Sequence, residues 1–524
     1  MNKSLILLML GCSLPVLMAA NEASTAPSTV SASEVTAMQK QIADLQKQLA
    51  VIMKQMQETK VEHKVVSAQQ VAKPVAEAVV APTVAKEEPK KENEHQFDKG
   101  YIAIPGTTGA VKFSGMVKLD MIRDTRANTS EQTCVGHLPY ALQMRNPNLP
   151  NTPAAWKDQF YMHAKQSKFR LETLVKNKSG SDVNAYVEGD FYGVTQWGDA
   201  FPNGTTGNNA PQSSTTYTFR LRHAIIAYSG LEVGHTTTTF NLDEIIMPSV
   251  DLNGINGYNR HALIRYTHKL GNFAITAAAE HARADYMTYT PTPTANGASA
   301  TTTNYAYNTQ DSAGNLSKPE RPDLILRLKY NFDNGSVVGL SVINRDLRVQ
   351  NNAALTGNLP STVDGKTYIA NSWGVNLTAK IMTVGGSFFT GGITTGKGLG
   401  WYLLDATGRS AFFDPNAAEG QKLKPIEMNM FWAGYSHVWC PQWQTTIGLA
   451  RITLGTQGLS NARKVTQWYE PGLDRTYNKF LINTMYMPEE NLKFGLEYFV
   501  LERKSTLGYK GLGHRLQFAA SYNF

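Results

Sequence analysis

The sequence predicts an all-β protein, a 16-stranded antiparallel transmembrane β-barrel that follows an N-terminal coiled-coil helix and an extended linker. The first observation is the segment 514–524, in which apolar and polar residues alternate up to the C-terminus. The second is that alternating segments of about 10 residues recur throughout residues 100–524, as a barrel that spans a bilayer requires. The third is that no run of about 18 apolar residues follows the N-terminal region, which excludes helical membrane spans.

The composition agrees with this fold class. Only 18% of the residues are charged, the mean hydropathy is slightly negative, and the chain holds 42 Gly and 23 Tyr. This is a β-rich profile. A membrane barrel is hydrophilic on average, because one face of each strand meets a wet lumen.

Residues 1–20 have the features of a secretory signal peptide, with one Lys, an apolar run and small residues before Asn21. The segment around Cys12 loosely resembles a lipoprotein acylation box, but the apolar run before it is very short. If Cys12 leaves with the signal peptide, the mature chain keeps Cys134 and Cys440. Two Cys so far apart in sequence do not form a disulfide framework.

Residues 21–58 are predicted to form a short coiled coil. Apolar residues recur there at intervals of three and four and give about three heptads of an a/d seam. The seam comprises Val35, Met38, Ile42, Leu45, Leu49, Ile52 and Met56. A lone amphipathic helix on a surface is the alternative, because nothing at the e and g positions fixes the number of chains. Residues 59–99, rich in Ala, Val, Pro, Lys and Glu, are predicted to be an extended linker.

The barrel domain is predicted to span residues 100–524 and begins with Gly-Tyr-Ile-Ala-Ile-Pro-Gly. After a signal peptide, a short coiled coil and a Pro/Ala linker, this entry resembles the DcaP-like porins of Gram-negative bacteria. Segments 219–224, 233–240 and 260–266 resemble the central region of that family. The run of four Thr in the second of these segments departs from the family, whose members usually carry a Trp there.

Alternating runs bounded by turn residues predict sixteen strands. The predicted strands are 111–124, 163–176, 182–192, 218–229, 231–240, 260–269, 273–283, 323–332, 336–349, 371–382, 384–393, 426–439, 443–455, 478–487, 491–503 and 513–524. The connections alternate between long and short, as in outer-membrane barrels with short periplasmic turns and long outer loops. An even count places both ends of the barrel on the periplasmic side.

The last strand carries a predicted assembly signal. Leu516, Phe518, Ala520, Tyr522 and Phe524 share its apolar face, and a terminal aromatic suits the interfacial girdle, where its carboxylate reaches water. The ending resembles the closing strand of bacterial outer-membrane proteins. That resemblance implies that Tyr522 and Phe524 are read by the barrel-assembly machinery.

Residues 241–258 follow the fifth predicted strand and form a long connection that is more apolar than the other loops. In general porins, the connection after this strand folds into the lumen and narrows it. By this resemblance Asp243, Glu244 and Asp251 are expected to face the constriction. The alternative is a loop that packs over the outer mouth.

Basic side chains are expected at inward positions opposite this loop. The candidates are Arg170, Arg220, Arg222 and Arg265, with Arg123, Arg327 and Lys329 as further members. Fixed positive charge in a pore concentrates anions and excludes cations. The alternative is that these side chains pair with acidic loop residues and form solvated wall. The net charge of +8 lies entirely in residues 100–524, since residues 1–99 carry eleven Lys and eleven Asp or Glu.

The predicted function is passive diffusion of small hydrophilic solutes across the outer membrane, with a preference for anions such as small carboxylates. His-Glu-x-x-His and Gly-x-Ser-x-Gly motifs are absent, so no enzyme activity and no cofactor are expected. His223, His235 and His281 lack Cys or carboxylate partners at ligand spacing, so no metal site is expected. The alternatives are an adhesin or cell-wall-anchoring barrel with little channel activity, and a barrel enzyme whose residues come from distant strands.

The expected partners follow from this interpretation. They are outer-membrane lipids, the assembly machinery during biogenesis, small hydrophilic or anionic solutes, and further copies of the chain. A homotrimer is favoured by the family resemblance and by the coiled coil. The N-terminal region is expected in the periplasm, within reach of peptidoglycan, and no nucleic-acid partner is expected.

Overall fold

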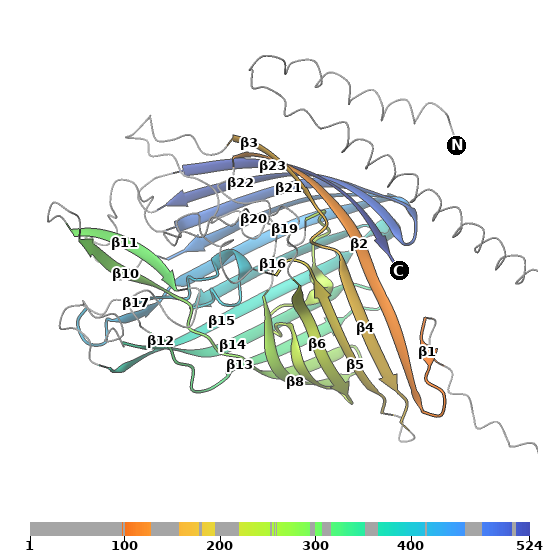
Figure 1. Cartoon of the computed structure of the whole chain (residues 1–524), viewed down its shortest axis with the longest axis horizontal. Helices are drawn as coiled ribbons and strands as arrows, with labels where there is room; N and C mark the ends of the chain where they lie inside the picture. The colour runs from red at the N-terminus through yellow and green to blue at the C-terminus, as the bar shows by residue number, and fades with distance from the viewer. Residues whose placement is uncertain are drawn as a thin grey trace, which may run out of the picture. The chain divides into compact units, whose positions relative to one another are not determined.

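The structure is a computed structural model, shown in Figure 1. It describes residues 97, 100–126, 157–177, 181–193, 219–251, 254–255, 257, 259–293, 299–306, 316–351, 365–413, 417–455, 474–505 and 510–524. The predicted signal peptide and coiled coil, all of the predicted linker except residue 97, and Cys134 lie outside the described residues. Within the described ranges, no helix is long and apolar enough to cross a membrane.

The described chain is a closed antiparallel barrel of sixteen strands, which confirms the predicted fold class. The wall consists of β2 (Gly109–Arg126), β3 (Lys157–His163) with β4 (Lys168–Val175), β5 (Val183–Asp190), β6 (Arg220–Tyr228), β7 (Leu231–Thr237), β8 (Arg260–Leu270), β9 (Phe273–Glu280), β13 (Asp323–Asn331), β14 (Val337–Gln350), β15 (Thr367–Met382), β16 (Phe388–Lys397), β19 (Glu427–Cys440), β20 (Trp443–Leu454), β21 (Asp474–Glu489), β22 (Leu492–Ser505) and β23 (Lys510–Asn523). β23 pairs with β2 from Asn523 opposite Met116 to Arg515 opposite Asp124, and this pairing closes the barrel.

The second predicted strand is interrupted in the structure, so its prediction as one continuous strand was wrong. β3 and β4 both pair with β2 and form two halves of one wall strand. The backbone turns between them, and Ser167 Oγ accepts a hydrogen bond from the Lys118 amide at 3.0 Å. Polar side-chain bonds therefore replace the ladder at this point.

The structure also contains elements that the sequence did not predict. Two-residue strands β1 (Ile102–Ala103) and β12 (Leu316–Ser317) add to the edges of β2 and β14. A separate four-stranded sheet is formed by β10 (Tyr286–Pro293), β11 (Ser299–Ala306), β17 (Ala411–Phe413) and β18 (Leu423–Pro425), which lie in two predicted long connections. The described residues also form three short 3-10 helices, η2 (Asp243–Ile245), η4 (Val384–Gly386) and η5 (Leu404–Ala406).

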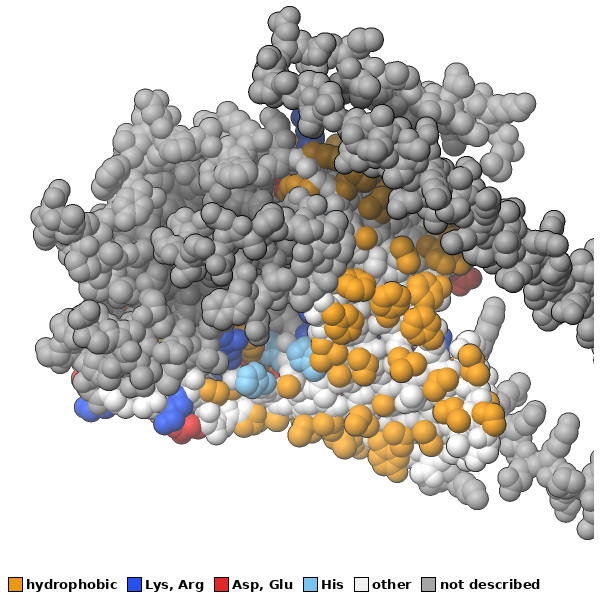
Figure 2. Space-filling view, in the orientation of Figure 1, with side chains coloured by type: hydrophobic (Ala, Val, Ile, Leu, Met, Phe, Trp, Pro, Cys, Tyr) orange, Lys and Arg blue, Asp and Glu red, His pale blue; other side chains and the backbone are white. Residues whose placement is uncertain are grey.

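The outer face of the wall carries apolar side chains, as the alternation predicts. On β23, Leu516 and Phe518 are exposed, whereas Arg515 and Gln517 on the opposite face are buried. Figure 2 shows apolar side chains gathered on the part of the outer wall that faces the viewer, where Figure 1 places β4, β5, β6 and β8. An apolar outer belt is the surface that lipid contact requires.

The C-terminal residue completes the seam between the first and last strands. Phe524 exchanges two backbone hydrogen bonds with Gly115 of β2, at 2.9 and 3.1 Å. Its ring is exposed and lies 5.7 Å from the ring of Phe113. The terminal aromatic therefore extends the outer apolar face, as the sequence predicted.

Candidate functional site

The described part of the connection between β7 and β8, residues 238–251, 254–255, 257 and 259, lies against the inner face of the wall; we call it the inner loop. Wall side chains donate hydrogen bonds to its carbonyl groups. These bonds run from Asn376 to Phe240 at 2.9 Å, from Asn483 to Pro248 at 2.9 Å and from Lys118 to Val250 at 2.5 Å. The donors belong to β15, β21 and β2 and lie on the faces opposite the exposed apolar side chains. The inner loop therefore crosses the interior of the barrel and does not pack over its outer mouth.

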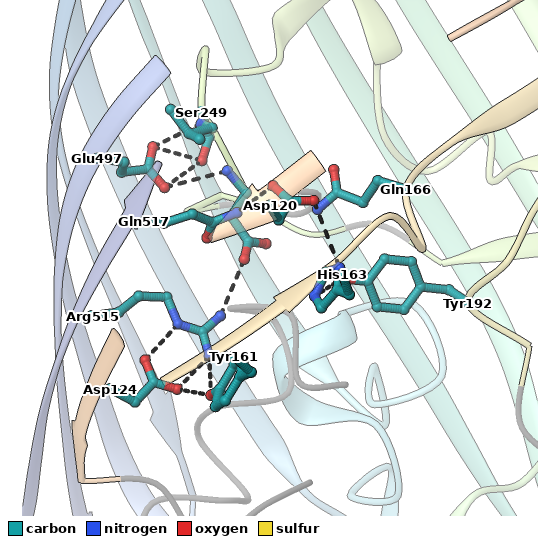
Figure 3. A network of polar contacts seen from close by, with 12 residues as sticks. Asp120, Asp124, Tyr161, His163, Gln166, Tyr192, Ser249, Glu497, Arg515 and Gln517 are labelled. Atoms are coloured by element: carbon teal, nitrogen blue, oxygen red, sulfur yellow. Dashed lines mark hydrogen bonds and ion pairs between the residues drawn. The ribbon is translucent and has the colours of Figure 1, made fainter. Parts of the chain in front are cut away.

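The middle of the inner loop, residues 249–251, is held by the buried carboxylate of Glu497 on β22 (Figure 3). This carboxylate accepts hydrogen bonds from Ser249 Oγ at 2.8 and 2.9 Å, from the Val250 amide at 2.9 Å and from Asn483 Nδ2 at 2.9 Å. A buried carboxylate with this many donors fixes the backbone in one place.

Arg515 of β23 links the same part of the inner loop to the seam between β2 and β23 (Figure 3). Its guanidinium donates to Asp124 of β2 in a bidentate pair, with both distances 2.7 Å, and to Asp251 of the inner loop at 3.2 Å. Tyr161 of β3 also donates to Asp124. The first strand, the last strand and the inner loop thus share one buried ionic cluster.

A second segment, residues 398–410 between β16 and β17, also packs inside the barrel; we call it the second inner loop. Tyr402 donates to the Asp323 carboxylate of β13 at 2.9 Å, and Asp405 forms an ion pair with Lys479 of β21. Asn259 donates to the Trp401 carbonyl at 2.7 Å, so the two inner loops are in contact. The segment falls in the long connection between the predicted strands 384–393 and 426–439, and no inward position was predicted for it.

The two inner loops and the wall enclose an apolar cluster. The inner loop contributes Phe240, Leu242, Ile245, Met247 and Ile255, the second inner loop contributes Leu399, Tyr402, Leu403 and Ala406, and the wall contributes residues such as Met428, Met430, Trp432, Ile452 and Leu481. These side chains are buried. The part of the lumen beside β14–β22 is therefore filled by packed protein.

The second inner loop is fastened at its end by Asp285, which lies beyond β9 and outside the wall strands. Its carboxylate accepts hydrogen bonds from the Gly408 amide at 2.6 Å and from Ser410 Oγ. Burial raises the pKa of the Asp285 carboxyl to about 6, and the charge of nearby Arg345 opposes this rise.

The four principal candidate arginines lie on the inner side of β4, β6 and β8, and each is paired with a carboxylate of the wall. The pairs are Arg170 with Glu172 at 2.8 Å, Arg220 with Asp190 at 2.5 Å, Arg222 with Glu188 at 2.8 Å and with Asp190 at 2.9 Å, and Arg265 with Glu232. The alternative expectation was pairing with acidic loop residues. The partners in the structure lie instead on the wall strands, with Glu172 on the same strand as Arg170 and the others on adjacent strands.

A β-bulge between β5 and β6 explains why the successive residues Arg222 and His223 both point inward. Glu188 pairs with His223, whereas Gly189 pairs with Leu221, so Arg222 is the extra residue. Its guanidinium contacts the carboxylates of β5, and His223 Nδ1 lies 2.8 Å from Thr236 Oγ1. A bulge re-aims a side chain in this way.

Arg123 does not line the interior, and its selection as a pore residue was wrong. It pairs across the ladder with Leu516 and with Phe160, which are both exposed apolar residues of the outer face. Directly opposite residues of an antiparallel pair point to the same face. Arg123 is itself exposed and belongs to that outer face.

The acidic candidates of the inner loop have different environments. Glu244 is exposed and forms an ion pair with Lys329 of β13, and Asp243 is also exposed. Arg327 of β13 donates to the Asn241 carbonyl of the inner loop at 3.2 Å. Asp251 is buried against Arg515, so it holds the loop and does not line an opening.

Several residues of the site were missed by sequence reasoning. They include Lys118, Lys168, Lys479, Glu497 and Arg515. Each is a charged residue on the polar face of a predicted strand, which is the only signal that the sequence offers. Within the described residues, no group of three or more His, Cys, Asp or Glu side chains is arranged to hold a metal ion.

Neither a protein-family model nor a curated protein matches the chain, but solved structures do. The outer membrane channel DcaP of Acinetobacter baumannii matches with a TM-score of 0.58 and 17% identity, over 79% of this chain and 97% of that chain. An anion-selective porin from Comamonas acidovorans matches with a TM-score of 0.43 and 12% identity, over 79% of this chain and 100% of that chain. OprB of Pseudomonas putida matches with a TM-score of 0.43 and 11% identity, over 79% of this chain and 94% of that chain.

The similarity to DcaP extends over nearly the whole of that channel and over the barrel of this chain. At this level of identity it shows the fold. The resemblance to DcaP-like porins, inferred from the sequence, is therefore confirmed for the architecture: the chain has a porin-type barrel similar to that of the DcaP outer membrane channel.

Proposed function

We propose that the protein is an outer-membrane porin through which small hydrophilic solutes diffuse passively, and that it favours anions such as small carboxylates. The observation that carries this proposal is the contrast between the two sides of the interior. The side chains of Lys168, Arg170 and Arg220 on β4 and β6 are 33%, 32% and 32% exposed. Those of Lys479 and Arg515 beside the inner loops are 0% and 1% exposed. The water-filled path of the proposed pore therefore runs beside the wall strands β4–β8.

The charge of this exposed side supports the preference for anions. Its basic residues are Lys168, Arg170, Arg220, Arg222, Arg260, Arg265, Arg327 and Lys329, and its acidic residues are Glu172, Glu188, Asp190, Glu232, Asp243, Glu244, Glu280 and Asp323, so the two signs are equal in number. On β4–β6, however, the exposed charge is mainly basic and gives a positive potential along this wall. The side chains of Lys168, Arg170 and Arg220 are 33%, 32% and 32% exposed, whereas those of Glu172, Glu188 and Asp190 are 16%, 8% and 1% exposed. In a pore with low-dielectric walls, such a potential raises the local concentration of anions.

The proposal extends to location and assembly. Residues 1–20 act as the signal peptide, 21–58 as a coiled coil that helps to join three chains, and 59–99 as a periplasmic linker within reach of peptidoglycan. Tyr522 and Phe524 act as the assembly signal. Outer-membrane lipid covers the exposed apolar belt, and the protein carries out no enzymatic reaction.

A planar bilayer experiment tests this function. The purified protein is inserted under a salt gradient, and both the conductance and the reversal potential are measured. A large conductance with a reversal potential that favours anions is expected. A folded, inserted barrel without conductance would instead support an adhesin or anchoring barrel. Conductance without anion preference would refute only the proposed anion preference.

A further inference from the structure

Five glycines at inward positions of the described wall are each in contact with an apolar side chain of an inner loop. The glycines are Gly339 on β14, Gly374 on β15, Gly434 on β19, Gly448 on β20 and Gly495 on β22. Glycine in the interior of a strand weakens the strand, and it often marks a place where another group approaches closely. A functional reason for these five positions is therefore needed.

Met247 of the inner loop contacts two of these glycines. Gly434 and Gly448 lie directly opposite each other on β19 and β20 and form one hollow in the wall. A Cβ atom at Gly448 would lie 2.1 Å from Met247 Sδ, and one at Gly434 would lie 2.3 Å from Met247 Cε. Neither position accepts a larger residue while Met247 stays in place.

Three more contacts repeat this arrangement. A Cβ atom at Gly339 would lie 1.9 Å from Leu242 Cδ1, and one at Gly495 would lie 2.6 Å from Val250 Cγ2. Val250 is buried there with Met485 and Ala519 of the wall. At Gly374 the nearest atom is Leu399 Cδ2 of the second inner loop, at 2.7 Å.

We propose that these wall glycines are sockets that set the depth of the inner loops against the wall, and that they thereby set the width of the open side of the pore. The proposal rests on the proposed porin function. The sockets receive the apolar side chains of the loops, while Glu497 and Arg515 hold the polar end of the inner loop (Figure 3). Filling a socket moves the loop away from its wall and towards the arginines of β4–β8.

Gly448 gives the sharpest test because its Cβ would meet only loop atoms. Its three nearest atoms are Met247 Sδ, Met247 Cε and Ile255 Cδ1, and none belongs to the wall. Gly434 is less suitable, because its Cβ would also lie 2.8 Å from the Ile447 carbonyl oxygen. A β-branched residue at 448 also suits a strand. The series Gly448→Ala, Gly448→Val therefore pushes first on the Met247 side chain of the inner loop.

The expected result is a stepwise loss of single-channel conductance from wild type through Gly448→Ala to Gly448→Val, with exclusion of progressively smaller neutral solutes. Adding Met247→Ala to Gly448→Val removes the clash, so the double variant is expected to regain most of the conductance. A glycine with only a structural role in β20 would not be rescued by a change in the loop. Gly109→Ala is the control, because its Cβ meets only ordinary contacts of 3.4 Å or more.

Hydrogen exchange of the inner-loop peptide, residues 239–251, provides a readout that does not depend on conduction. Faster exchange in Gly448→Val and recovery in the double variant are expected, because the displaced loop loses its bonds to Asn483 and Glu497. If wild type does not conduct but this exchange pattern holds, the porin function fails while the sockets stand. If wild type conducts and the folded Gly448→Val variant matches it in conductance and in exchange, the sockets are refuted.

Gly495 keeps the proposal testable if the Gly448 variants fail to fold. The three nearest atoms to its Cβ position all belong to Val250. Gly495→Ala is expected to reduce conductance, and Val250→Ala in the same chain is expected to restore it. Conductance that stays reduced in this second pair would also overturn the proposal.

Discussion

Arg515, nine residues before Phe524, donates a hydrogen bond of 3.2 Å to Asp251 in the middle of the inner loop. The same guanidinium holds Asp124 of the first wall strand in a bidentate pair. The Arg515 side chain thus links the two strands that close the barrel to the loop that crosses its interior. The cluster is complete only when β2 and β23 are paired, since it needs side chains from both.

Arg515→Met is expected to destabilise the barrel. The change keeps the bulk of the side chain but leaves Asp124 and Asp251 buried without their cation. Breaking a buried ion pair from one side costs about 3–5 kcal/mol. The temperature at which the folded barrel unfolds in detergent, followed by gel mobility, checks this result.

Arg321→Met is the matched control for that experiment. Arg321 pairs with Asp346 through a side chain that is about one-third exposed. Such pairs contribute about 0–1 kcal/mol. An Arg515 variant that unfolds at the same temperature as the control would show that the seam cluster adds no stability.

Replacing Arg220 and Arg222 together by Gln is expected to move the reversal potential towards cations while conductance persists. The change removes two positive charges and leaves Glu188 and Asp190 without these partners. Salt limits the field of each charge to about 8 Å at physiological ionic strength, and the field reaches further in dilute salt. The shift in reversal potential is therefore expected to grow on dilution. The measurement is the reversal potential under salt gradients of different absolute concentration.

Arg123→Gln is the control for selectivity, because Arg123 lies on the outer face. Its reversal potential is expected to equal that of wild type. Unchanged selectivity in the Arg220/Arg222 double variant at low ionic strength would mean that these arginines do not act on the permeating ions.

Deletion of residues 21–99 is expected to leave a folded, conducting oligomer of lower thermal stability. About three heptads bury little area beside the flank of a barrel, so the walls are expected to supply most of the interface. Cross-linking and gel mobility in detergent check the number of chains. A variant that is monomeric would assign the assembly to the coiled coil.

No disulfide is expected between Cys134 and Cys440 of one chain. Cys440 ends β19 beside the short turn to β20, and it is a free thiol in the structure. Cys134 is predicted in the first outer loop, about 30 Å or more away across the bilayer, whereas a disulfide needs Cα atoms within about 7 Å. Mass spectrometry of the non-reduced protein checks this. A peptide that links the two residues would contradict the predicted sidedness.

The sequence by itself determined the barrel. Alternation with a period of two is a local property of each strand, so the sixteen strands and the outward series that ends at Phe524 follow from neighbouring residues alone. The same alternation also identifies Arg123 as an outer residue, since it shares its parity with Val117 and Leu119. The outer position of Arg123 therefore follows from the sequence alone.

Only the tertiary structure decided what fills the interior. The inner-loop partners of Arg515 and Glu497, Asp251 and Ser249, lie 264 and 248 positions away in the chain, and no local pattern relates them. A glycine such as Gly448 reads as a weak point in its strand until Met247 is seen to lie on it. Side-chain contacts between a loop and a distant wall depend on how the closed barrel brings them together, so they arise only when the whole chain has folded.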